Sequence, residues 1–516
     1  MSNRNHRARK WPNAFQDMVE HNLSNSISLV ARNLESPEVF QAHFESLMCQ
    51  VQWGYQYCPE VSAKLLLSMH PWPARWALID SWCYQLELAI DIPDIPFSEK
   101  TQLKACLTDV YLVAGLPQKV IDISKDLFIP GFEDQGEYAK LVVFSGGAWI
   151  SALISQGKLS QAEEILHEME QHLSSPNQNQ QIQMARAILS LQKAILLRHE
   201  NKLPEALDTL TYVIKSLAPV SPLTRSIFFE VVETRAVFYR ASGNYDAALA
   251  DLYELQNNYI RDGEQLAQSS LHGNRGLVYW SMANYKDAER ELLCAIEITE
   301  KHKAYPLLSR QLGPLSLIYL AKGDIEKAIR FVERQIEITN VTNNLSEKTL
   351  ASANRSCMLI YAHRAEEALP DLLFSLNEML VQGRQELTIS AHLDLAICYY
   401  TLGDMQNSQY HALQAYESSI QGENKINKML AMRALALSQD AQEATSLLYE
   451  ALEIAKDNGK LLDEAACLLC LSQIEPIIDL KEKYWNEAAC LLERIGAEKW
   501  LDRKNIGQPT ILPLLL

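Results

Sequence analysis

The stretch Tyr239-Arg-Ala-Ser-Gly243-Asn-Tyr245-Asp-Ala-Ala248 returns 40 residues later as Tyr279-Trp-Ser-Met-Ala-Asn-Tyr285-Lys-Asp-Ala288. It returns once more, after another 40 residues, as Tyr319-Leu-Ala-Lys-Gly323-Asp-Ile-Glu-Lys-Ala328. A period of this length is typical of a solenoid built from helical hairpins. The repeat therefore predicts an all-α fold before any local pattern is considered.

The last alanine of this phrase marks further copies along the chain. The successive marks are Ala162, Ala206, Ala248, Ala288, Ala328, Ala368, Ser408 and Ala444. Val120 extends the series toward the N-terminus and Ala488 toward the C-terminus. We therefore expect about nine to ten repeats.

Each repeat is predicted to contain two amphipathic helices around a Gly or an Asn. In the repeat marked by Ala288, the residues Leu292, Ala295 and Ile296 follow at helical spacing and form an apolar stripe. A left-handed residue is expected to end the first helix of a repeat. The candidates for this role are Gly115, Gly157, Gly243, Gly323 and Gly403, with Asn201 and Asn284 in two other repeats. One hairpin cannot bury its own stripe, so the hairpins must stack into a right-handed superhelix with a concave surface.

This pattern resembles the tetratricopeptide repeat (TPR) family. Gly276, Tyr279, Tyr285, Ala288 and Ala295 hold the places of the family's signature in the best-formed repeat. The repeat of 40 residues exceeds the family's usual 34 and is similar to the repeat regions of bacterial MalT-type and LuxR-type regulators. The resemblance covers about residues 100 to 495. It implies that the first helix of each hairpin lines a concave groove for a protein or peptide.

The resemblance also indicates groove candidates among first-helix residues outside the signature. Asn274 holds the position from which peptide-clamping members of the family bind a ligand's backbone or carboxylate. Such a clamp also uses Lys or Arg of adjoining repeats, a role that Arg240 and Arg310 could fill in a partial match. Trp280 and Asn354 are further groove candidates, as are Leu277, Leu317, Leu320 and Tyr361.

The pair Asn274-Arg275 recurs two repeats later as Asn354-Arg355, and Thr234-Arg235 precedes it by one repeat. An Arg at this place replaces the usual Leu. Two interpretations are open. Arg275 and Arg355 either bridge neighbouring hairpins through ion pairs with Glu, or line a groove for an acidic or phosphorylated segment.

The two ends of the chain depart from the repeat. We expect a flexible basic tail over 1–13, an irregular helical region over 14–100, the solenoid over 101–505 and an apolar tail over 506–516. The Trp- and Pro-rich region is interpreted either as a cap over the first repeat or as a module that docks a partner. The tail ends in Leu512-Pro-Leu-Leu-Leu516 and either folds back over the last helix or is captured by another protein.

Composition excludes several classes of function. A net charge of -17 opposes binding to nucleic acid, which needs clustered Lys and Arg. No run of 18 apolar residues indicates a membrane span, and no secretory signal follows the basic N-terminus, so we expect a cytoplasmic protein. Ten cysteines in 516 residues are too few for a disulfide scaffold.

Catalytic motifs are not found in the sequence. Neither phosphate-binding Gly spacing nor a Gly-x-Ser-x-Gly elbow occurs, and His167 and His172 are five residues apart where a zinc hydrolase needs four. The pair Cys467 and Cys470 has no second pair at zinc spacing. We therefore expect no metal, no cofactor and no enzyme, but a scaffold or adaptor that binds a protein or peptide. The alternative is a peptide- or ligand-sensing regulator that acts on a separate effector chain, and an unrecognised hydrolase is a third possibility.

Overall fold

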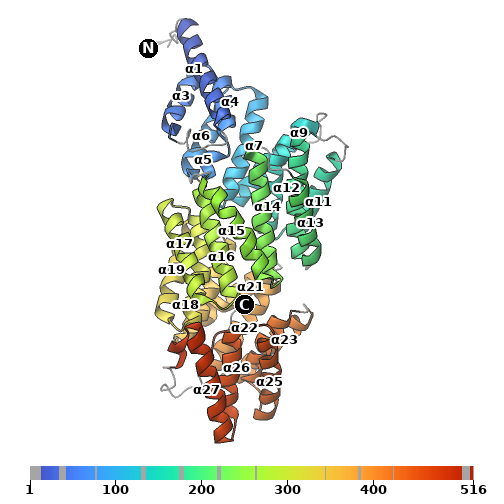
Figure 1. Cartoon of the computed structure of the whole chain (residues 1–516), viewed down its shortest axis with the longest axis vertical. Helices are drawn as coiled ribbons and strands as arrows, with labels where there is room; N and C mark the ends of the chain where they lie inside the picture. Colours follow the sequence, from blue (N-terminus) through green and yellow to red (C-terminus); the bar gives the residue numbers. More distant parts are fainter. Residues whose placement is uncertain are drawn as a thin grey trace, which may run out of the picture. The chain divides into compact units, whose positions relative to one another are not determined.

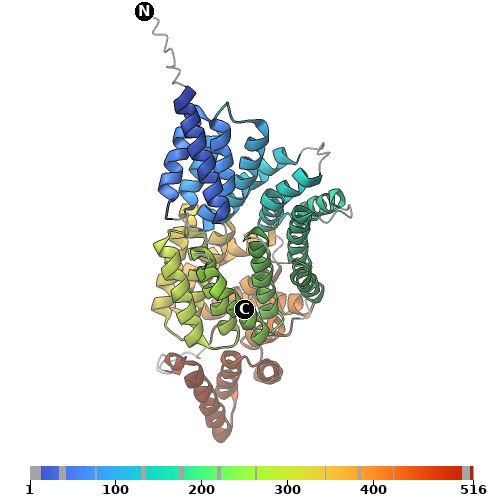
Figure 2. The same ribbon diagram turned by 45° about the horizontal axis from the view of Figure 1, so that its top comes forward.

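The computed structural model describes most of the chain, and every regular element in the described ranges is a helix (Figures 1 and 2). The described residues are 13–33, 42–75, 78–128, 135–173, 179–200, 202–217, 222–261, 264–342, 345–381, 385–421, 424–501 and 512–514. The basic cluster at residues 4–10 and Asn201 lie outside these ranges. The all-α prediction is confirmed.

The first helices are of unequal length and do not follow the repeat. They are α1 (Asn13–Arg32), α3 (Phe44–Tyr57), α4 (Pro59–Met69), α5 (Trp72–Arg75) and α6 (Ile79–Asp91). Their core includes Trp82, which is fully buried and donates from Nε1 to Nδ1 of His70 at 3.4 Å. A tryptophan of this region therefore serves as a core residue.

From α7 onward the helices of the described ranges form ten successive hairpins. The first five are α7 (Phe97–Val113) with α8 (Pro117–Leu127), α9 (Gln135–Leu141), η1 (Val142–Gly146) and α10 (Gly147–Ser155) with α11 (Leu159–His172), α12 (Gln180–His199) with α13 (Leu203–Ser216), α14 (Pro222–Ala241) with α15 (Tyr245–Arg261), and α16 (Gln265–Ser281) with α17 (Tyr285–Lys301). The other five are α18 (Tyr305–Ala321) with α19 (Ile325–Thr342), α20 (Leu345–Tyr361) with α21 (Ala365–Val381), α22 (Gln385–Thr401) with α23 (Met405–Gln421), α24 (Lys425–Ala436) with α25 (Ala441–Asp457), and α26 (Leu461–Ile474) with α27 (Ile478–Ile495). The predicted α-solenoid is thus confirmed.

Left-handed residues end the first helices, largely as the sequence predicts. All five glycines named for this role have a positive φ, between 71° and 82°. The prediction for Asn284 is wrong, because Ala283 takes the positive φ of 56°. Asn284 instead caps α17, and its side chain accepts a hydrogen bond from the backbone N–H of Asp287. An Asn at a helix start satisfies an N–H group that would otherwise lack a partner.

The small residue that marks each repeat lies where helices approach most closely. The side chains of Ala162, Ala206, Ala248, Ala288, Ala328, Ala368 and Ser408 are all fully buried. Ser408 also donates from its hydroxyl to the carbonyl of Ala396 on the preceding helix, at 2.9 Å. A larger side chain at these positions would separate the two helices of a hairpin.

The chain divides into two compact units. Unit 1 comprises residues 1–242 and 250–268, and unit 2 comprises residues 243–249 and 269–516. In unit 2 the first helices α18, α20, α22 and α24 each contact the next of the series, and the second helices α19, α21 and α23 contact one another less. Helices on the inside of a curved stack lie closest together, so we call the face made by these four first helices the inner surface of unit 2.

One helical stretch of unit 1, Gly136–Ser155, is long and apolar enough to cross a membrane by length and composition alone. Its most apolar window is 67% buried inside the structure. Burial of this extent is typical of a core helix.

Candidate functional site

The residues expected to line the groove all lie on first helices, but not in one unit. Arg240 lies on α14 of unit 1, and the others lie on α16, α18 and α20 of unit 2. Arg310 is exposed, and Arg275 is buried with 2% of its surface exposed. The remaining residues are half-buried, namely Asn274, Trp280, Asn354, Arg355 and Arg240. A role of these residues in binding stays a prediction.

The recurring arginines form ion pairs inside their own hairpins. Arg275 on α16 donates from Nε to Glu291 on α17 at 2.9 Å, and Arg355 on α20 lies 3.4 Å from Asp371 on α21. In unit 1, Arg235 on α14 donates to Asp251 on α15, and these two residues are 16 apart, as in the other two pairs. The interpretation that they bridge neighbouring hairpins is therefore corrected: each pair joins the first and second helix of one hairpin. The pairs of Arg275 and Arg235 are largely buried, whereas Asp371 in the third pair is 45% exposed. Charge-assisted pairs of this kind fix how two helices pack.

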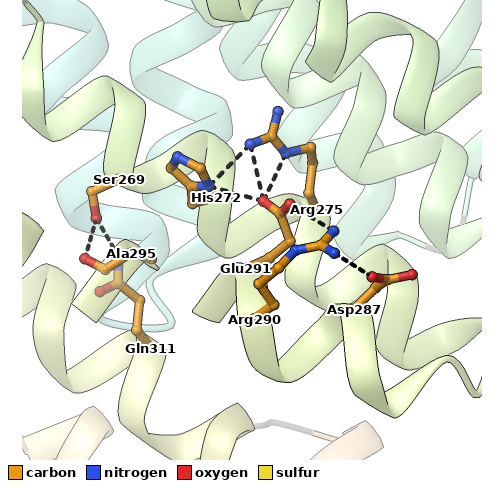
Figure 3. A network of polar contacts seen from close by, with 8 residues as sticks. All are labelled: Ser269, His272, Arg275, Asp287, Arg290, Glu291, Ala295 and Gln311. Carbon is orange, nitrogen blue, oxygen red and sulfur yellow. Dashed lines mark hydrogen bonds and ion pairs between the residues drawn. The ribbon is translucent and has the colours of Figure 1, made fainter. Parts of the chain in front are cut away.

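Glu291 is the centre of a network of polar side chains between α16 and α17 (Figure 3). Its Oε2 lies 2.8 Å from Nδ1 of His272 and 2.9 Å from the Arg275 guanidinium. Arg290 extends the network to Asp287 at 2.8 Å. Burial alone would raise the pKa of Glu291, but the hydrogen bond with His272 and the charge of Arg275 hold it below its usual range. Glu291 is therefore ionised, and its carboxylate is already bonded to His272 and Arg275 of the same hairpin.

A second set of hydrogen bonds crosses to the next hairpin. Gln311 on α18 donates from Nε2 to the hydroxyl of Ser269 on α16 at 2.6 Å, and accepts from the hydroxyl of Thr299 on α17 at 3.0 Å. Ser269 donates in turn to the carbonyl of Ala295 (Figure 3). A buried amide with all these partners joins three helices and is suited to structure rather than to catalysis.

The hairpin of α22 and α23 carries His392 and His411, which are 19 residues apart. His272 and Glu291 have the same separation in the hairpin of α16 and α17. Nδ1 of His392 lies 2.9 Å from Nδ1 of His411, and the ring of His411 stacks on Tyr399. Burial and the neighbouring His411 lower the pKa of His392 to about 4, and burial lowers the pKa of His411. Both rings are therefore neutral at pH 7, with one Nδ1 donating and the other accepting.

Acidification from pH 7 to pH 5 is expected to lower the melting temperature (Tm) of the chain through these histidines. The unfolded chain binds a proton near pH 6.5 and the folded His392 only near pH 4, so stability present above pH 6.5 is lost as the pH falls toward 4. Discounted for partial exposure, a loss of about 1 kcal/mol corresponds to about 1–2 °C for a chain of this length. Tm measured by circular dichroism should fall less in His392→Gln than in the wild type. The same change at the exposed His167 is the control, and equal slopes for both variants would contradict the prediction.

The inner surface of unit 2 holds a buried ion pair that the sequence analysis missed. Arg433 on α24 donates from Nη1 to Asp463 on α26, and only 4% of Arg433 is exposed. The Nη2 group of Arg433 donates to the main-chain carbonyl of Leu512 at 3.1 Å. Its Nε has no hydrogen-bond acceptor among the described residues. Arg433 thus ties the C-terminal segment to a first helix that precedes it by 79 residues.

Close to this pair lies a second buried carboxyl group. Asp394 on α22 shares a hydrogen bond with the Cys357 thiol on α20. Burial raises the pKa of Asp394 to about 7, against the effect of that bond. The charges of Asp394 and Arg433 also act on the phenol of Tyr361, which is one helical turn from Cys357. First helices α20, α22 and α24 therefore all contribute polar groups to this part of the inner surface.

The residues after α27 return to the turn between α18 and α19. Trp500 is 1% exposed and donates from Nε1 to the carbonyl of Ala321 at 2.9 Å. Lys499 reaches Asp324 at 2.8 Å. A Cβ atom on Gly323 would lie 3.0 Å from the Lys499 Cβ, so this glycine serves both the left-handed turn and a close approach of two segments. The end of unit 2 is thereby joined to its middle.

Comparison with known proteins finds a likeness of structure only. No family model and no curated protein matches the sequence. The chain is similar to a Rap protein solved in complex with competence and sporulation factor, with a TM-score of 0.54 and 14% identity over 71% of this chain and 100% of that one. The two chains therefore share a fold. The likeness shows an α-solenoid of TPR-like hairpins.

Two other solved structures are less similar. One is the apo form of RapI, with a TM-score of 0.47 and 12% identity over 69% of this chain and 98% of that chain. The other is a signal transduction ATPase with numerous domains and a tetratricopeptide repeat sensor, from Pyrococcus horikoshii. Its TM-score is 0.42 and its identity 12%, over 90% of this chain and 74% of that chain.

Proposed function

We propose that the chain is a non-catalytic, cytoplasmic adaptor that binds an extended segment of a protein or peptide on the inner surface of unit 2. One observation supports this proposal above the others. The inner surface already buries a non-helical segment, Leu512–Leu514, and donates to its main chain from Arg433. Helices that are ordered in advance can bind such a segment without the entropic cost of ordering the site.

Residues of the neighbouring first helices would extend the contact. Asn274, Arg310 and Asn354 lie on α16, α18 and α20, and Arg310 is exposed. Amide and guanidinium groups suit the carbonyl and carboxylate groups of a bound chain. Arg275 is a poorer candidate because it is buried in its ion pair with Glu291.

The second candidate is a peptide-sensing regulator that acts on a separate effector chain. The contacts of Lys499 and Trp500 with the turn at Gly323 favour it, since they join distant parts of unit 2 and a ligand could release them. The Rap protein of the same fold was solved with a bound factor, competence and sporulation factor. A large change in the scattering profile on addition of a peptide would support this candidate over the adaptor.

Affinity capture with a charge-reversed variant tests the adaptor. We expect a stoichiometric partner, identified by mass spectrometry from the source cell, to be retained by the wild type. Arg310→Glu should weaken its binding about ten-fold or more, which is ~1.4 kcal/mol. The matched control is Arg330→Glu, which reverses an exposed charge on the second helix α19. Equal recovery with Arg310→Glu, Asn354→Asp and the control would contradict binding at these residues.

A further inference from the structure

The segment Leu512-Pro513-Leu514 is not helical, yet all three residues are buried. Leu512 is 1% exposed and Leu514 is 4% exposed. Both leucines belong to the same hydrophobic cluster as the core residues of α17 to α27. The segment therefore packs into unit 2 as a short non-helical stretch whose apolar side chains enter the core.

Main-chain groups of this segment are held by side chains of the first helices. Arg433 on α24 donates to the carbonyl of Leu512. The backbone of Leu514 lies close enough to the Tyr361 phenol on α20 to oppose the rise in its pKa that burial causes. Contacts with main-chain groups do not depend on the side chains of the bound segment. Another segment with apolar residues at the two leucine positions and the same backbone path could make them.

The helices that surround the segment also bond to one another directly, without the segment. Asp463 on α26 holds Arg433, and Asp394 on α22 bonds to Cys357 on α20. Arg433 carries more donors than these contacts use, because its Nε has no acceptor among the described residues. A segment that also supplies an acceptor for this N–H would bind better than Leu512–Leu514 does.

The segment is joined to α27 by a short length of chain, which favours it over any separate peptide. A segment covalently joined to its site has an effective concentration there that a free peptide lacks. A competing segment must overcome this advantage. An internal ligand of this kind sets a threshold for binding, because only a tight or abundant partner can take its place.

We propose that Leu512-Pro513-Leu514 is an internal ligand that occupies the binding site of unit 2, and that the partner is a protein segment in which apolar residues flank a proline and displace it. This inference rests on the proposed adaptor function and specifies the ligand of the same site. Its regulatory consequence is that the chain is closed to weak partners until the segment leaves.

A synthetic peptide with the sequence of residues 509–516, Pro-Thr-Ile-Leu-Pro-Leu-Leu-Leu, tests the proposal. The peptide carries a fluorophore on a polar N-terminal spacer, and its anisotropy is measured during titration with the full chain. The full-length variant Leu512→Asp/Leu514→Asp should bind it at least about ten-fold more tightly than the wild type, because buried aspartates expel the internal segment. The matched control is Ile477→Asp/Ile478→Asp, at positions 55% and 70% exposed, and it should bind as weakly as the wild type.

Each outcome decides the proposal. It is overturned if the aspartate variant keeps its helical circular dichroism and binds the peptide no better than the wild type. If that variant loses its helical signal, Leu512→Ser/Leu514→Ser replaces it in the same titration. Unfolding of both variants would overturn the proposal too, because the segment would then be an obligatory part of the core. The Arg310→Glu capture experiment does not involve this segment, so the adaptor function can hold where the internal ligand fails.

Discussion

Trp500→Ala is expected to lower the free energy of unfolding by about 3–5 kcal/mol. The indole is 1% exposed, lies edge-on to Tyr361 with ring centroids 5.8 Å apart, and donates to the carbonyl of Ala321. Its removal leaves a large cavity and an unpaired carbonyl at the contact between the end of unit 2 and the turn after α18. Urea-induced loss of helical circular dichroism measures the effect.

Two further variants separate the contributions of Trp500. Trp500→Phe keeps most of the apolar contact and loses the N–H donor, so it should cost about 1–3 kcal/mol. Trp53→Ala removes a tryptophan that is 56% exposed and should cost much less. If Trp500→Ala were as mild as Trp53→Ala, the contact with Ala321 would not stabilise the fold.

The fold was predictable because it depends on residues with geometric roles at a fixed period. Gly403 ends a first helix at a positive φ of 82°, and Ala288 is fully buried between two helices, as their places in the repeat indicate. His363 shows the limit of this reasoning. His363 adopts a φ of 61°, a conformation that its side chain disfavours by about 1 kcal/mol. We infer that the packing of the hairpin outweighs this local cost.

The candidate site was predictable only in part, because its contacts connect residues whose separation in the sequence does not follow the 40-residue repeat. Arg433 and Leu512 are 79 residues apart, and Trp500 and Ala321 are 179 apart. The signals available were an Arg inside the apolar run Met429-Leu-Ala-Met-Arg433-Ala-Leu and an apolar chain end. A charge within an apolar helix indicates a buried partner but does not identify it. The sequence indicated an apolar chain end and left open whether it folds back over the last helix or is captured by another protein. The contacts shown for Leu512 and Leu514 are with α24 and α20.

Arg433→Met is expected to lower the free energy of unfolding by about 3–5 kcal/mol at pH 8. The change leaves Asp463 buried without its counter-charge and removes the donor to the Leu512 carbonyl. Burial already raises the pKa of Asp463, and the loss of Arg433 will raise it further. A carboxyl group with a raised folded pKa destabilises the fold as the pH rises through that pKa, so the deficit should be smaller at pH 4 than at pH 8.

The double variant Arg433→Met/Asp463→Leu distinguishes a buried charge from a lost contact. If the cost of Arg433→Met comes from an unpaired carboxylate, removal of both charges should recover a large part of it, because an apolar pair of similar volume carries no desolvation penalty. The double variant should then be more stable than either single variant at pH 8, and its deficit should not depend on pH between 4 and 8. Additive costs would show instead that Arg433 stabilises unit 2 through Leu512, and the cost of Arg433→Met should then match that of Leu512→Ser/Leu514→Ser. The same urea titrations therefore decide whether the ion pair or the C-terminal segment carries the stability of the inner surface.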